Sequence, residues 1–136
     1  MMQSQNTLHT EVGTATLLDD QIIEVTIHSG IELNKEMMLN GFRQLSELAG
    51  GRYALLVDRT TSDYSMSFEA MQLNASDPNL LAQALLIPAY NSHKQMLAEL
   101  SINLSQRHDI PFEVFSDRRL ALDWLGAHRD TASRDG

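Results

Sequence analysis

Hydroxyl and charged residues gather directly after an apolar run in the middle of the chain: Asp58, Arg59, Thr60, Thr61 and Ser62. In such a segment a carboxylate can orient the loop, the hydroxyls can contact a ligand or accept a phosphate, and an arginine can balance negative charge. Tyr90 and Arg118 follow two later apolar runs in the same way. These residues are candidates for binding a small ligand or for phosphorylation.

The same residues also have structural interpretations. Side-chain hydroxyls in a connection commonly satisfy nearby backbone groups. Ser67, Ser92 and Ser116 each stand where a helix is expected to begin, and a serine there caps the helix. The free N–H groups of those helix ends would also favour an anion, such as a phosphorylated or carboxylate ligand. We favour the structural roles and keep the anion site as the alternative.

Catalytic and metal-binding patterns are sparse. The sequence has no nucleophile elbow of the type Gly-x-Ser-x-Gly, no phosphate-binding Walker loop and no His-Glu-x-x-His. It has no cysteine, and its five histidines lack metal-ligand spacing. We therefore expect no metal and no cofactor, and a non-catalytic binding module in preference to an enzyme. A small hydrolase or transferase that uses the same residues is the alternative.

Four of the seven methionines could line an adaptable groove for an apolar ligand or partner. They are Met37, Met38, Met66 and Met71. Their helical spacing favours ordinary core packing.

Composition narrows the function classes further. The chain has 136 residues, of which 43% are hydrophobic, and a formal net charge of −8. This length favours one globular domain. An acidic surface repels phosphate backbones and anionic lipids, so we expect no binding to nucleic acid. No apolar run is long enough to insert into a membrane, and the first residues lack the pattern of a signal peptide, so we expect a cytoplasmic protein.

Strand and helix signals alternate along the chain. Strands are predicted at 13–18, 22–28, 53–57, 82–87 and 112–115, and the first two form a hairpin. Helices are predicted over 34–49, from Ser67 to before Asp77, from Ser92, and from Ser116. This order, β-β-α-β-α-β-α-β-α, indicates an α/β domain with a mixed five-stranded sheet and four helices. We place the domain at 9–128, with flexible termini at 1–8 and 129–136.

Parallel strands put their exit loops at one edge of the sheet. The loops at 58–67, 89–92 and 116–119 should therefore meet. This edge would bind a protein partner or a small ligand. The predicted first strand, 13–18, would lie at the side of the sheet with unpaired backbone groups, so we also expect that a homodimer can form.

The element order resembles the STAS domain, and more closely the small stand-alone bacterial proteins called SpoIIAA-like. The resemblance lies in 54–61 (Ala-Leu-Leu-Val-Asp-Arg-Thr-Thr), 85–88, 110–117 and 121–125, and spans about Gly13 to Leu125. It implies a STAS-like fold and a regulatory role. In antagonist members of that family a serine after an aspartate, between the third strand and the second helix, is phosphorylated. The stretch here begins with Asp58, has Thr60 after the basic residue, and lacks the family's glycine.

Overall fold

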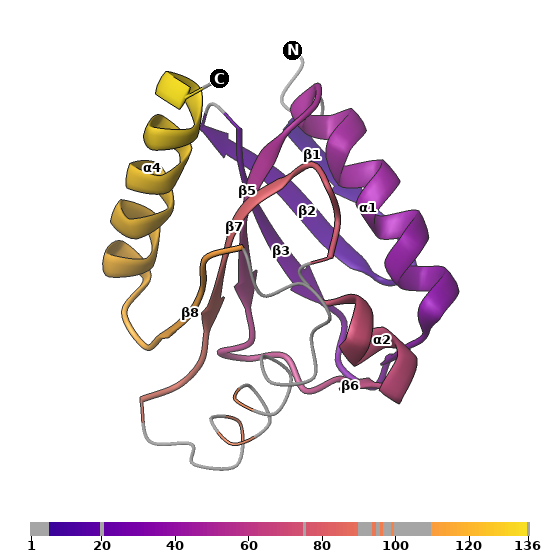
Figure 1. Ribbon diagram of the computed structural model, residues 1–136. Coiled ribbons are helices and arrows are strands. Elements are labelled where there is room, and N and C mark those ends of the chain that lie inside the picture. Colours follow the sequence, from indigo (N-terminus) through magenta and orange to yellow (C-terminus); the bar gives the residue numbers. More distant parts are fainter. Residues whose placement is uncertain are drawn as a thin grey trace.

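A six-stranded mixed sheet forms the centre of the molecule in the computed structural model (Figure 1), which describes residues 6–19, 21–74, 76–89, 94, 96, 99 and 110–135. The strands, in spatial order, are β1 (Thr7–His9), β2 (Gly13–Asp19), β3 (Ile22–Ile27), β5 (Tyr53–Asp58), β7 (Leu80–Leu86) and β8 (Phe112–Phe115). β1, β2 and β3 are antiparallel neighbours, and β3, β5, β7 and β8 run parallel. The predicted hairpin and the parallel strands are confirmed.

The predicted count of five strands is wrong because β1 adds a sixth. Thr10 closes the β1–β2 turn: its backbone N–H donates to Gly13 O at 2.9 Å, and its Oγ1 accepts from the N–H groups of Val12 and Gly13. Gly13 must be glycine, since a Cβ there would lie 2.2 Å from Thr26 O of β3. A strand of three residues is too short to show alternation, which is why the sequence pattern missed it.

β1 also changes the argument for self-association. It covers the side of β2 that was expected to be exposed, since Thr7 pairs with Thr16 and His9 with Thr14. The homodimer therefore stays a prediction without its original basis. A further two-stranded sheet, β4 (Glu32–Leu33) with β6 (Ser65–Met66), was not predicted either.

Three helices lie in the described residues: α1 (Lys35–Ala49), α2 (Phe68–Leu73) and α4 (Arg118–Asp135). The predicted caps of α1 and α2 are confirmed, because Asn34 Oδ1 accepts from Met37 N–H at 2.9 Å and Ser67 Oγ from Ala70 N–H at 3.1 Å. The predicted cap of the last helix, Ser116, is wrong. The side chain of Asp117 accepts from the N–H groups of Arg119 and Leu120 instead.

The helix count of four is not reproduced among the described residues, because the helix expected from Ser92 falls largely outside them. Regular structure extends past both predicted domain bounds, since β1 begins at Thr7 and α4 runs to Asp135. The flexibility of 1–8 and 129–136 stays a prediction.

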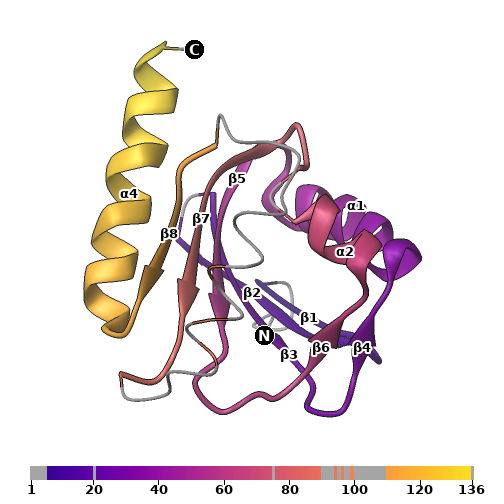
Figure 2. The same ribbon diagram turned by 60° about the horizontal axis from the view of Figure 1, so that its bottom comes forward.

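Helices cover both faces of the sheet (Figures 1 and 2): α4 lies on one face, and α1 and α2 lie on the other. On the α4 face, Ala54, Ala82 and Ala84 are fully buried and allow Ala121 and Leu125 to pack closely. On the α1 face, Leu45 packs with Leu55 and Leu85. Burial on both sides explains the continuous apolar runs of β5 and β7.

Candidate functional site

The predicted edge of the sheet is occupied by an internally bonded turn after β5. Asp58 Oδ1 accepts from Thr60 N–H at 2.9 Å and from Thr60 Oγ1 at 2.6 Å. The Ser62 hydroxyl is buried and donates to Ile27 O. Two of the three candidate hydroxyls are thus hydrogen-bonded within the protein, Thr60 to the neighbouring Asp58 and Ser62 to β3, and Thr61 is the exposed one.

The Lys94 side chain also binds the backbone of this turn. Its Nζ donates to Arg59 O at 2.7 Å and to Ser62 O at 3.1 Å. The turn is therefore held at its backbone as well as by its own side chains.

Arg118 lies on the α4 side of the same edge and is already paired. Its Nη2 donates to Glu24 Oε1 at 2.8 Å, and the hydrogen bonds with Glu24 raise the pKa of Arg118 above its usual range. The charge of Asp58 contributes to this rise. A guanidinium that is already paired with a carboxylate is a poor anion site. Tyr90, the remaining candidate, lies outside the described residues.

Arg59 is turned the other way, into the α1 face, and only 6% of its surface is exposed. Its Nη2 donates to Tyr64 O at 2.7 Å, and its guanidinium carbon lies 4.1 Å from the centroid of the Tyr64 ring. Burial raises the pKa of the Tyr64 hydroxyl, and the charge of Arg59 opposes that rise. The pair forms part of the wall of a cavity.

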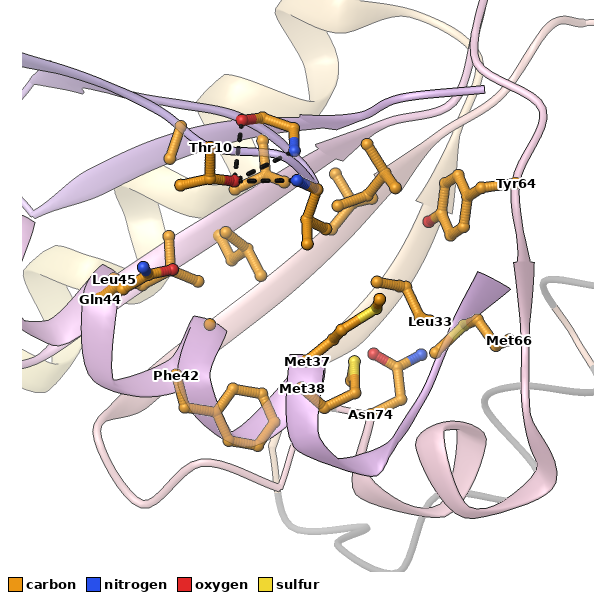
Figure 3. Close-up of a pocket in the computed structure, with 18 of the residues that line it drawn as sticks. Thr10, Leu33, Met37, Met38, Phe42, Gln44, Leu45, Tyr64, Met66 and Asn74 are labelled. Atoms are coloured by element: carbon orange, nitrogen blue, oxygen red, sulfur yellow. Dashed lines mark hydrogen bonds between the residues drawn. The ribbon is translucent and has the colours of Figure 1, made fainter. Parts of the chain in front are cut away.

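This cavity has a volume of about 590 Å³ and lies between α1 and the sheet. Figure 3 shows Tyr64 and Met66 at one end, Phe42 and Leu45 at the other, and Met37 and Met38 between them. Most of the lining is apolar, and it includes the following residues: Leu8, Val12, Val25, Ile27, Leu33, Met37, Met38, Phe42, Leu45, Leu55, Val57, Met66, Met71 and Leu85.

The mouth of the cavity is marked by its exposed lining residues. These are Glu11 on the β1–β2 turn, Asn40 on α1 and Ser65 on β6. Other polar side chains of the wall already have hydrogen-bond partners. Gln83 Nε2 donates to Asn74 Oδ1 at 2.9 Å, and Thr10 Oγ1 donates to Gly13 O within the β1–β2 turn. An apolar space of this size with few polar groups has the character of a small-molecule site.

The sequence favoured core packing for the four methionines over a groove for an apolar ligand. Met37, Met38 and Met66 do pack against a core cluster, and all four methionines also line the cavity. Of the described residues predicted for the site, Arg59 alone lines it. One signal that could have indicated the cavity is Gly41, a glycine in the middle of a helical pattern. Within the described ranges, no group of three or more His, Cys, Asp or Glu side chains is placed to hold a metal ion.

Comparison with known proteins supports the fold. A solved structure of an uncharacterized protein from the DUF3478 family with a SpoIIAA-like fold, from Shewanella loihica PV-4, is 17% identical to this chain. The match covers 88% of this chain and 89% of that one, with a TM-score of 0.53. The fold is thus SpoIIAA-like and STAS-like, as the resemblance in the sequence implied.

A family model described as "Domain of unknown function (DUF7793)" matches residues 16–129. No curated protein matches the chain. Among the residues that the structure describes, no helix has the length and apolar character needed to cross a membrane.

Proposed function

The chain belongs to the DUF7793 family of domains of unknown function, and we propose, from the cavity described above, that it is a non-catalytic module that binds an apolar small molecule between α1 and the sheet. The observation that carries the proposal is an open space of about 590 Å³ walled by aliphatic, aromatic and methionine side chains. Ligand sites in proteins fall in the range of about 300–1,000 Å³ and are mostly apolar.

The make-up of the wall supports a flexible, apolar occupant. Met37, Met38, Met66 and Met71 come from α1, β6 and α2 and converge on one space. Methionine side chains are unbranched and polarizable, so they adapt to ligands of differing shape. The titratable lining residues are Glu11, Arg59 and Tyr64, and Arg59 stacks on Tyr64. That set offers no nucleophile with an adjacent base, which favours binding over the hydrolase or transferase alternative.

A neutral fluorescent probe tests the proposal. N-phenyl-1-naphthylamine should bind the native chain at one saturable site, with the enhanced and blue-shifted emission of an apolar environment. Gly41→Leu should weaken this binding by about tenfold or more, because Gly41 lines the cavity and a Cβ there meets nothing within 4 Å. The added side chain therefore extends into the space that the probe needs.

Gly126→Leu is the matched control. Gly126 is also a helical glycine, but it lies on α4, outside this cavity. Its variant should bind the probe as the native chain does. The proposal is wrong if the native chain shows no saturable binding, or if Gly41→Leu binds as tightly as Gly126→Leu.

A further inference from the structure

Arg59 carries a buried positive charge whose hydrogen bonding is incomplete. A guanidinium has five N–H donors and stays charged under all ordinary conditions. Nη2 donates to Tyr64 O, but Nε is buried and has no hydrogen-bond partner among the residues that the structure describes. No ion pair links Arg59 to a carboxylate in the part of the chain described by the structure. A buried cation without a counter-ion is unfavourable, and an anion placed against it removes that penalty.

The position of Arg59 gives the cavity a charged end. Arg59 lines it together with Tyr64, on whose ring its guanidinium stacks. Figure 3 shows Tyr64 on the same side of the cavity as Met66. From there the apolar wall continues along α1 to Phe42 and Leu45 (Figure 3). The stretch of α1 from Met38 to Leu45 is about 10 Å long at the rise of a helix. The space is thus long and apolar, with one cation at one end.

The negative charges nearby point elsewhere. Asp58 accepts from Thr60 and follows the face of β5 that packs against α4, and Asp63 is exposed on the loop after β5. Glu11, the acidic lining residue, is exposed at the mouth of the cavity. The chain as a whole has a net charge of −8, so general attraction would not bring an anion here. An anion would have to be recognised locally, by Arg59.

We propose that the ligand is an amphipathic carboxylate, an aliphatic chain with a single carboxylate head. The head contacts the guanidinium of Arg59, and the chain lies along α1 toward Phe42 and Leu45. A planar guanidinium matches a carboxylate with two parallel hydrogen bonds. This inference rests on the proposed function, since it names the chemical class of the apolar molecule in the same cavity.

The test compares three ligands with the same aliphatic chain. Dodecanoate, dodecan-1-ol and dodecyltrimethylammonium, each below its aggregation limit, are titrated to displace N-phenyl-1-naphthylamine from the native chain. Dodecanoate should bind about tenfold or more tightly than the alcohol, and the cation should bind most weakly. Equal affinities for the acid and the alcohol would overturn the inference while leaving the apolar site intact. Failure of the probe itself to bind would refute the proposed function and this inference with it.

Variants of Arg59 test whether this residue causes the preference for the carboxylate over the alcohol. The acid-to-alcohol affinity ratio is measured within each variant, so a general change in the cavity cancels. Arg59→Met should bring the ratio close to one, and Arg59→Lys should retain part of it because the charge remains. Arg43→Met, which removes an exposed arginine from α1, should keep the native ratio. If Arg59→Met does not fold, the Arg59→Lys ratio and the three-ligand series on the native chain still decide. A native ratio in Arg59→Lys or Arg59→Met would contradict the assignment.

Discussion

Asp58 and Arg59 are consecutive residues whose side chains lie on opposite faces of the sheet. Asp58 continues the face of Ala54 and Leu56, which pack against α4, whereas Arg59 stacks on Tyr64 on the α1 side. Successive residues of a strand alternate in this way, and the alternation continues one residue past β5. The carboxylate and the guanidinium that stand together in the sequence therefore serve different environments, and only Arg59 reaches the cavity.

Replacing Gly41 with alanine should stabilise the protein by about 1 kcal/mol, the difference in helix propensity between the two residues. Gly41 lies inside α1 without a positive φ, and a Cβ there has open space. The free energy of unfolding, measured in urea, tests this. Gly50 provides the opposite case because its φ is +78° at the end of α1. Gly50→Ala should lower the free energy of unfolding. If Gly41→Ala and Gly50→Ala change this free energy in the same direction, the account is contradicted.

Tyr53→Phe should destabilise the protein by about 1–3 kcal/mol, the range for losing a buried hydrogen bond to a charged group. The Tyr53 hydroxyl is buried and donates to Asp77 Oδ2 at 2.5 Å. Tyr64→Phe is the control, since its hydroxyl has no hydrogen bond with the described residues, and it should cost less. Urea unfolding of both variants measures which one loses more stability. A larger loss of stability for Tyr64→Phe would be inconsistent with the structure.

Stability should fall at alkaline pH. Burial, and for Tyr53 also the hydrogen bond and charge of Asp77, raises the pKa of both Tyr53 and Tyr64. Above about pH 10 the unfolded chain loses tyrosine protons that the folded chain retains. Each such tyrosine then lowers the free energy of unfolding by about 1.4 kcal/mol per pH unit. Urea titrations between pH 9 and 11 measure this slope. Tyr53→Phe should make the slope shallower, and an unchanged slope in that variant would refute the assignment.

Breaking the ion pair between Glu24 and Arg118 should change the stability of the protein only slightly. The Arg118 side chain is 49% exposed and that of Glu24 is 18% exposed, and exposed ion pairs are worth about 0–1 kcal/mol. Glu24→Gln should therefore lower the free energy of unfolding by less than about 1 kcal/mol, and by less still in high salt. A loss that is large and independent of salt would show that the pair has a structural role that its exposure does not indicate.

Local signals account for what the sequence could predict of the fold. Alternation placed β3, continuous apolar runs placed β5 and β7, and cap residues placed the starts of α1 and α2. β1 and the β4–β6 pair are only three and two residues per strand, too short for periodicity to show. Ser116 and Asp117 are adjacent and both are residue types that cap helices, so the sequence did not show which of them caps α4. In the structure the cap is Asp117.

The candidate site was harder to predict because it depends on contacts between distant segments. The spacing of the methionines indicated that they face inward, but not that α1, α2 and β6 leave a cavity between them. The direction of Arg59 depends on where β5 ends, and its stacking depends on Tyr64, which lies in a loop. Neither can be read from the local pattern of residue types.

Methyl NMR of the methionines tests the central claim most directly. With ¹³C-methyl-labelled methionine in the native chain, dodecanoate should shift the signals of the four methionines that line the cavity, Met37, Met38, Met66 and Met71. Met96, which is 63% exposed and lies outside the cavity, should keep its signal position. Saturable shifts confined to those four residues are the predicted result. Unchanged signals for the four, or shifts at Met96 alone, would contradict a ligand site between α1 and the sheet.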